Sequence, residues 1–170
     1  MKLTILGSGG GEGYPALFCN CAHCKAAKKA GGKSIRTLSQ SCIDGKLLID
    51  FPADSHIHVI NNDLNFGDIE NLLITHTHSD HYMPDLFELR GGAFAHDMKA
   101  EKLTVYGNED VKKLFDGIFT YIPINPTIRQ NIGFVRAEAF KPFKVDDYEV
   151  TPLPAKHALE QQAFNYIIDD

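Results

Sequence analysis

The sequence lacks any apolar run long enough to cross a membrane. The apolar stretch at residues 1–6 is cut off at Gly7, which is too short for the apolar region of a signal peptide. The chain also lacks an excess of positive charge, with 17 Lys and Arg against 22 Asp and Glu and a formal net charge of −5. Such a chain has no general attraction to nucleic acid or to an anionic membrane. These absences predict a cytoplasmic protein without a membrane partner, and they disfavour a nucleic-acid partner.

The glycine-rich segment 7–13 lacks both common phosphate-binding patterns. No register of it gives G-x-G-x-x-G, and none gives the P-loop lysine pattern. Tyr14-Pro15 follows it, with no sign of a helix start. A structural turn is the first interpretation, and close approach of this backbone to a substrate phosphate is the second.

The cysteine spacing expected of a disulfide framework is lacking as well. Cys19, Cys21 and Cys24 fall within six residues, a spacing that suits a metal better than disulfides. Three thiolates need a fourth ligand to close a tetrahedral zinc site, and His23 is awkwardly close to Cys24 for that role. Free reduced thiols are the alternative. Cys42 precedes a strand and is predicted to be a small buried residue.

Apolar patterning predicts strands mixed with helices and no internal repeat. A hairpin is expected at 41–49, where Asp44-Gly45 is a type I′ turn signal. Helices are expected after Asp54 and after Asn108, both of which can cap a first turn. Further strands are expected at 2–6, 71–75, 102–106, 134–140, 148–153 and 163–168. This mixture predicts a layered α/β or α+β fold in one domain over residues 1–170.

The strand at 71–75 runs directly into His76, His78, Asp80 and His81. In extended backbone His76 and His78 point to the same side, and the following turn brings Asp80 and His81 toward a second point nearby. Neutral imidazole and carboxylate are ligands that suit zinc, manganese or iron. Solvated loop residues or helix caps would explain one such side chain, but three histidines and an aspartate in six residues favour a metal site.

The pattern His76-x-His78-x-Asp80-His81 after an apolar strand resembles the H-x-H-x-D-H signature of the metallo-β-lactamase fold. Other landmarks agree with it: the N-terminal strand that meets a Gly-Ser-Gly bend, Leu47-Leu48-Ile49-Asp50, and Leu153-Pro154-Ala155-Lys156-His157. These landmarks extend over almost the whole chain. The resemblance implies an αββα sandwich and a metal-dependent hydrolase.

The same resemblance implies a role for each candidate side chain. One divalent ion, zinc or manganese, would be held by His76, His78 and His157, and a second ion by Asp80 and His81. His78 and Asp80 are the residues assigned to catalysis, with Asp80 also accepting a hydrogen bond from the attacking water. Asp50 is expected behind the ligands, orienting an imidazole through its other ring nitrogen.

In this fold a bridging aspartate and a further histidine complete the second site, later than the strand expected at 163–168. The sequence ends at Asp170. We therefore expect a fold that is incomplete at its C-terminal end: a truncated product, a fragment or a subunit completed by another chain. The strand at 163–168 would be an uncovered edge, and the second metal would bind weakly.

Cys19-Asn20-Cys21-Ala22-His23-Cys24 resembles the C-x-C-x-x-C insert of PhnP-type phosphodiesterases, here at about residues 14–33. That resemblance implies a structural zinc on Cys19, Cys21 and Cys24, with a distant histidine as fourth ligand. It also implies hydrolysis of a cyclic phosphate such as phosphoribosyl cyclic phosphate. The predicted activity is hydrolysis of a cyclic or small diester phosphate by a metal-bound hydroxide. A homodimer is one assembly left open.

Three other functions stay open at this point. A nuclease of the tRNase Z kind shares the H-x-H-x-D-H signature, although the acidic net charge and the cysteine insert disfavour it. A thioester or lactone hydrolase would use the same metal site, which does not select phosphorus over carbon. A catalytically incomplete metal-binding module is the alternative that is not an enzyme.

Two more histidines, His56 and His58, follow the strand that ends at Asp50. We expect them either to line the cleft or to lie on an exposed helix face. His96 is expected at the surface or behind the metal ligands.

Overall fold

The computed structural model of the protein describes residues 1–121, 124–157 and 161–169. One sheet has the order β1 (Leu3–Gly7), β2 (Gln40–Ile43), β3 (Leu47–Ile49), β4 (Asn71–Leu73), β5 (Leu103–Gly107) and β6 (Ile132–Arg136). Its first three strands are antiparallel, and β3 to β6 are parallel. The other sheet is antiparallel and has the order β7 (Phe143–Val145), β8 (Tyr148–Ala155) and β9 (Ala163–Asp169).

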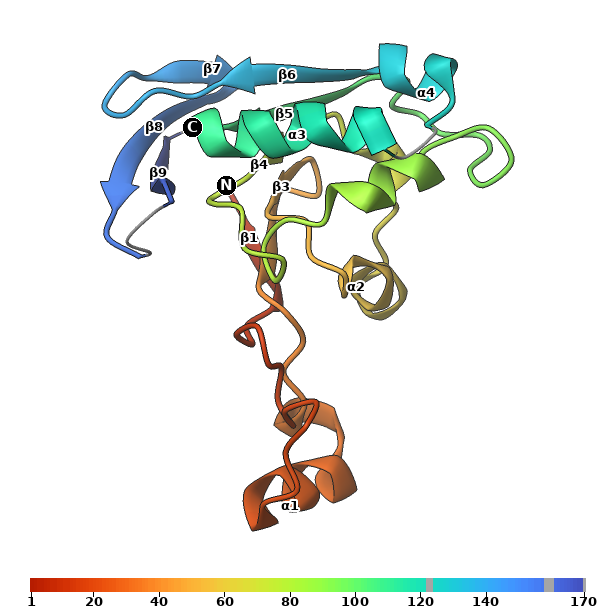
Figure 1. Cartoon of the computed structure of the whole chain (residues 1–170), viewed down its shortest axis with the longest axis vertical. Helices are drawn as coiled ribbons and strands as arrows, with labels where there is room; N and C mark the ends of the chain where they lie inside the picture. The colour runs from red at the N-terminus through yellow and green to blue at the C-terminus, as the bar shows by residue number, and fades with distance from the viewer. Residues whose placement is uncertain (122–123, 158–160, 170) are drawn as a thin grey trace.

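The helices are α1 (Ala22–Ala30), α2 (Ser55–Asn62), α3 (Glu109–Tyr121) and α4 (Pro126–Gln130), with 3₁₀ turns η1 (Gly32–Ser34), η2 (Phe66–Asp68) and η3 (Pro84–Leu89). α3 packs on β5 and β6, α4 on β6, and α2 on β1 (Figure 1). The described residues thus form a helical layer and two packed sheets, as the layered α/β prediction requires. In the described part of the chain, no helix is both long and apolar enough to span a bilayer.

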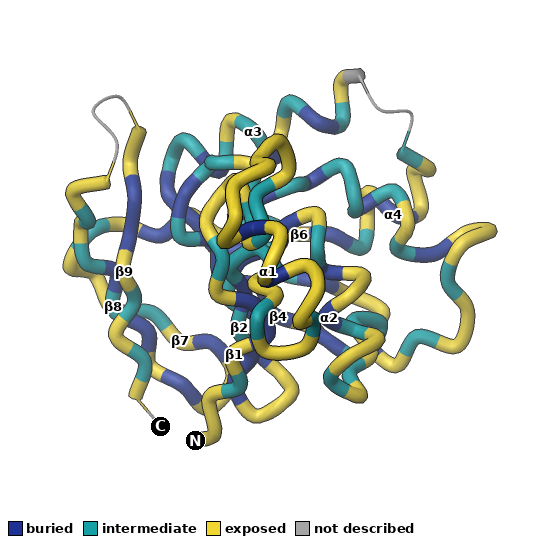
Figure 2. The backbone as a smooth tube through the Cα atoms, turned by 90° about the horizontal axis from the view of Figure 1, so that it is seen from below, coloured by how far each residue is buried: buried dark blue, intermediate teal, exposed yellow. Residues whose placement is uncertain are grey.

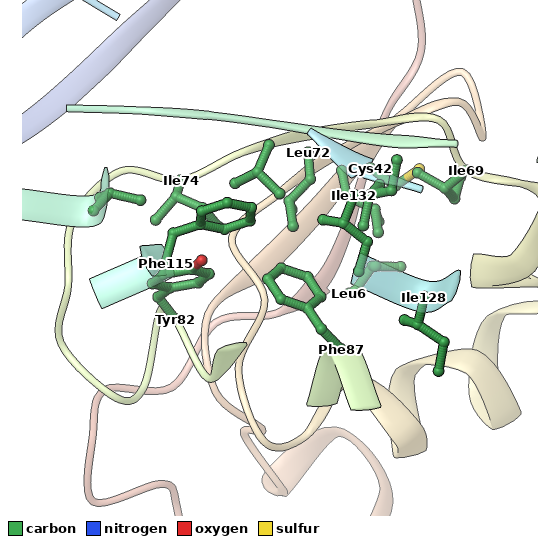
Figure 3. Close-up of a cluster of buried hydrophobic side chains, with 14 residues drawn as sticks. Leu6, Cys42, Ile69, Leu72, Ile74, Tyr82, Phe87, Phe115, Ile128 and Ile132 are labelled. Atoms are coloured by element: carbon green, nitrogen blue, oxygen red, sulfur yellow. The ribbon is translucent and has the colours of Figure 1, made fainter. Parts of the chain in front are cut away.

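Consecutive residues of the central strands enter two different apolar cores. Leu72 packs between the larger sheet and the helices, beside Phe87 and Phe115 (Figure 3), whereas Leu73 faces Val150 of the second sheet. This alternation explains why the apolar run of this strand is nearly continuous, as predicted for a strand buried on both faces. Each of these buried side chains contributes about 1.5–3 kcal/mol relative to leaving it exposed.

The predicted hairpin is confirmed, and its turn ties the two sheets together. Asp44 and Gly45 have φ values of 50° and 70°, and the Lys46 amide donates to the Ile43 carbonyl at 2.9 Å. Positive φ at both central positions defines the type I′ turn. The Asp44 carboxylate accepts the Tyr148 hydroxyl at 2.6 Å, and that bond holds the pKa of Asp44 below its usual value.

The remaining predicted elements are found with a few corrections. Asn108 caps α3, because its side-chain oxygen accepts the amide hydrogens of Asp110 and Val111, both at 3.0 Å. The strand expected at 134–140 ends at Arg136, since a turn follows in which Phe140 has a φ of 62°. Six elements were not predicted from the sequence: α1, α4, η1, η2, η3 and β7.

β9 pairs with β8 and with no other strand among the residues that the structure describes. Its Phe164 amide also donates to the Thr75 carbonyl at 2.9 Å, which joins the second sheet to the end of β4. Asp170, where the sequence ends, lies outside the described residues.

Between β1 and β2 the chain leaves the sheet as a protruding arm, defined here as residues 14–36. Tyr14 and Arg36 close its base through two backbone hydrogen bonds of 3.0 and 2.7 Å. α1 and η1 lie at its far end, well away from both sheets (Figure 1). The cysteine-rich insert expected at about 14–33 falls within this arm.

Gly7, at the end of β1, has no space for a side chain. A Cβ atom there would lie 2.0 Å from the Leu38 carbonyl oxygen and 2.7 Å from His58 Nε2. Gly7→Ala is therefore expected to lower the free energy of unfolding by at least about 1–3 kcal/mol in urea titrations. Gly133→Ala is the matched control, because a Cβ there meets nothing within 4 Å. Equal stability of the two variants would contradict this packing.

Candidate metal centre

The loop after β4 is held in place by its own backbone and by the segment that follows β3. The amides of His81 and Tyr82 both donate to the His78 carbonyl, at 2.9 and 2.8 Å, which forms a tight turn. The Phe51 amide donates to the His81 carbonyl at 2.7 Å. The side chains of this loop therefore lie at the end of the parallel strands, on a backbone held by its own turn and by Phe51.

Three imidazoles, two from this loop and one from the end of β8, converge on a point. His78 Nδ1 lies 3.1 Å from His76 Nε2 and 3.2 Å from His157 Nε2. Ligand atoms 2.0–2.1 Å from a tetrahedral zinc ion lie about 3.3–3.4 Å apart, so these spacings fit one ion bound by all three nitrogens. His76 is buried, His78 is half-buried and His157 is exposed, which leaves the point open on one side.

His76 has its free nitrogen directed at this point. Its Nδ1 lies 3.0 Å from the Thr75 hydroxyl, which donates to Asp50 at 2.9 Å and is therefore an acceptor for His76. The Nδ1–H tautomer follows, and it leaves the Nε2 lone pair for a metal. Burial and then the neighbouring imidazoles lower the pKa of His76 to about 4, so this ring is neutral near pH 7.

Asp80 and His81 form a second group of ligand atoms beside the first. The Asp80 carboxylate lies 3.4 Å from His81 Nε2, and the ring of His81 is 4.2 Å from that of His76. His81 Nδ1 donates to Asp50 at 2.7 Å, which leaves Nε2 free to act as a ligand. Burial lowers the pKa of His81, but the Asp50 hydrogen bond and charge outweigh it, so the net shift is upward.

Asp50 itself is 4% exposed and lies behind the two groups of ligand atoms. Its carboxylate accepts the Thr75 amide at 2.8 Å, the Thr75 hydroxyl and the ring of His81. One carboxylate therefore orients His81 directly and His76 through Thr75. The sequence indicated the role of Asp50 but not its two partners.

Two features of this region were not found from the sequence. Gly11 lies against the loop of residues 76–81, called the metal loop below, since a Cβ at Gly11 would be 3.5 Å from the Asp80 carboxylate. The expectation for His58 was wrong: it neither lines the cleft nor lies on an exposed face. It is 1% exposed, with Nδ1 2.7 Å from Gln40 Oε1 and Nε2 2.8 Å from the Thr37 hydroxyl. His56 is exposed on the same helix, and His96 is exposed as well.

Three cysteines gather at the end of the arm. The sulfur atoms of Cys19, Cys21 and Cys24 all lie within 4.8 Å of one another, and tetrahedral zinc requires sulfurs about 3.8 Å apart. Cys21 caps α1, with its sulfur 3.4 Å from the Cys24 amide. Hydrogen bonds from Cys24 and Cys19 lower the pKa of Cys21 to about 7, which favours the thiolate that binds metal. Cys42 is buried in the core, as predicted.

A cleft of about 740 Å³ opens beside the metal loop, between β1–β3 and the ends of β8 and β9. His76, His81 and His157 line one side of it. Its other walls mix apolar and polar residues, and the polar ones include Ser8, Ser41, Asn165 and Lys156. A small anion could therefore reach the histidines and meet a positive charge and hydroxyl groups there.

Residues 51–170 match the family described as a beta-lactamase superfamily domain, and the chain belongs to that family. The resemblance to the metallo-β-lactamase fold is thereby confirmed. One similar solved structure is a diphosphatase from the PhnP family (23% identity, TM-score 0.74, covering 98% of this chain and 61% of that one). Another is Zn²⁺-bound PqqB from Methylobacterium extorquens (21% identity, TM-score 0.67, covering 98% and 58%).

Among curated proteins, a ribonuclease Z from Leuconostoc mesenteroides is 26% identical over 171 residues, which cover all of this chain and 49% of that protein. The chain spans about half the length of the curated relatives that it matches. The family rests on the match over residues 51–170, and the solved structures support the fold.

Proposed function

We propose that the protein is a metal-dependent phosphodiesterase acting on a cyclic or small diester phosphate. The observation that carries this proposal is the convergence of three imidazole nitrogens beside the cleft, with Asp80 and His81 next to them. Family membership and the fold of a PhnP-family diphosphatase support it. Zinc or manganese is the ion that this donor set suits.

In this proposal His76, His78 and His157 hold one ion, and Asp80 and His81 contribute to a second. A bound divalent ion supplies a Lewis acid and lowers the pKa of water toward about 7. Asp80 would also accept a hydrogen bond from the attacking water at its carboxylate, and His78 would act in catalysis as a ligand of the first ion. Lys156 orients the phosphate through its charge, and Asp50 fixes the rings of His76 and His81.

The cysteines of the arm have a different task. We infer that Cys19, Cys21 and Cys24 hold a structural zinc that fixes the turn before α1. The convergence of their sulfurs and the lowered pKa of Cys21 support this assignment. Residues 19–24 lie far from both sheets in Figure 1, so this ion would stabilise the arm and take no part in hydrolysis.

The proposal is tested by removing and restoring metal. Protein stripped with a chelator is expected to lose hydrolysis of bis(p-nitrophenyl) phosphate, and zinc or manganese should restore it. A thioester and a lactone assayed in parallel separate phosphorus from carbon chemistry. Turnover of the thioester or lactone alone would reject the phosphodiesterase proposal, and turnover of none would favour a binding module.

A second candidate is cleavage of an RNA phosphodiester, favoured by the sequence similarity to a ribonuclease Z. The same metal centre would perform either reaction. End-labelled RNA incubated with the metal-loaded protein distinguishes them, because RNA cleavage without turnover of small cyclic phosphates would favour the second candidate.

A further inference from the structure

We propose that the arm, residues 14–36, is a binding surface for single-stranded nucleic acid. The arm holds five of the 17 Lys and Arg residues and none of the 22 Asp and Glu residues. Its charge is +5, which leaves −10 for the rest of the chain. The net charge of the chain is negative although one segment of it is basic. Such an asymmetry of charge is typical of chains that bind polyanions.

The arm presents these charges together. Lys25, Lys28 and Lys29 are exposed at i, i+3 and i+4 of α1, whereas Cys24 and Ala27 are the buried residues of this helix. The spacing places the three ammonium groups along one side of the helix. A polyanion lying on that side would meet all three.

Two more cations continue the basic surface toward the base of the arm. Lys33 and Arg36 are exposed and line a hollow of about 380 Å³ together with His23, Tyr14 and Ser34. The Arg36 guanidinium also donates to the Ser8 hydroxyl at 2.9 Å, which keeps it near the protein surface. Such a hollow offers a phosphate two positive charges and additional hydrogen-bond donors.

The lysines of the arm are not neutralised by carboxylates. None of Lys25, Lys28, Lys29 and Lys33 makes an ion pair with a residue that the structure describes. On the body, by contrast, lysines such as Lys99 bind acidic partners. Charges without partners are available for phosphates, and their binding would release counterions.

Exposed aromatic rings on the arm suit unpaired bases, and α1 itself does not suit a membrane surface. Phe18 is 95% exposed and Tyr14 is 39% exposed, and rings of this kind stack on unpaired bases. Most of α1 is exposed (Figure 2), and its exposed residues are Ala, His and Lys, so the helix lacks a large apolar face. Helices that lie in a membrane surface need such a face.

The position of the arm fits a role in delivering a strand. Gly11, three residues before the arm begins, lies against Asp80 of the metal loop, so the base of the arm adjoins the candidate centre. This inference goes beyond the proposed activity and does not rest on it, because binding by the arm does not require hydrolysis.

The test measures binding of a fluorescein-labelled 20-nucleotide poly(U) RNA to the full chain by anisotropy, from 50 to 200 mM KCl. Lys25→Gln, Lys28→Gln and Lys29→Gln combined are expected to weaken binding about tenfold or more and to reduce the salt slope by about 2. Phe18→Ala should weaken binding at every salt concentration. Lys99→Gln, Lys141→Gln and Lys144→Gln combined change the net charge equally and should bind like wild type.

Three results would overturn the proposal: no RNA binding by wild type, an equal loss in the control variant, or binding to phosphatidylserine vesicles without binding to RNA. Circular dichroism of each variant verifies that the arm remains folded. A gel of the recovered RNA separates binding from cleavage, so failure of the hydrolase proposal would be recognised independently.

Discussion

Replacing His76 by alanine is expected to remove the metal of the candidate centre and to lower phosphodiester hydrolysis by at least about 10³-fold. His76 is buried, and its Nε2 lies 3.1 Å from His78 Nδ1. Without it, two imidazoles remain at the first position, one of them exposed. Metal content by mass spectrometry and steady-state turnover measure the two effects, and His78→Ala should behave in the same way.

The matched control is His56→Ala, which removes an exposed histidine from α2 and should leave metal content and turnover unchanged. The zinc assigned to the cysteines should also stay in the His76→Ala protein, at one equivalent per chain. Wild-type turnover by His76→Ala would end the proposed mechanism. Loss of all metal from that variant would instead argue against a separate zinc in the arm.

Asp50→Asn is expected to weaken metal binding and turnover by about 10–100-fold, although Asp50 is not proposed as a ligand. The carboxylate accepts hydrogen bonds from Thr75 and from His81 Nδ1. An asparagine offers one acceptor oxygen and places N–H groups where the other oxygen accepted, so His81 or Thr75 must reorient. Titration with zinc followed by calorimetry measures the affinity, and urea unfolding measures stability separately.

The control for this change is Asp54→Asn. Asp54 is a partly buried carboxylate that accepts the Leu38 amide at 2.9 Å and bonds no imidazole. A loss of metal affinity as large as that of Asp50→Asn would show that the effect comes from general destabilisation. Undiminished affinity in Asp50→Asn would show that the rings keep their orientation without this carboxylate.

The sequence predicted the layered fold because its main signals are local. Leu72 and Leu73 are both apolar because they face different cores, and Asp44-Gly45 adopts the type I′ turn that these residue types favour. The ligand pattern of the metal loop is likewise contained in six residues. Local patterns of this kind can be interpreted from the sequence without knowledge of tertiary contacts.

The interactions that the sequence did not reveal are long-range. His58 was expected to be exposed or in the cleft because it lies among polar residues of α2, yet Gln40 and Thr37 bury it with full hydrogen bonding. The approach of Gly11 to Asp80 depends on how the arm leaves the sheet. Neither arrangement follows from local periodicity, because each joins segments at least 18 residues apart.

The arm enters and leaves the sheet through adjacent backbone positions. Gly9 donates to the Thr37 carbonyl at 2.7 Å, and Tyr14 and Arg36 exchange two further hydrogen bonds. These bonds hold the two ends of the arm together independently of the residues between them. Doubling the length of such a loop raises the free energy of closing it by only about 0.6 kcal/mol. The arm is thus modular: evolution or an engineer can shorten, enlarge or replace residues 15–35 while β1 and β2 keep their register.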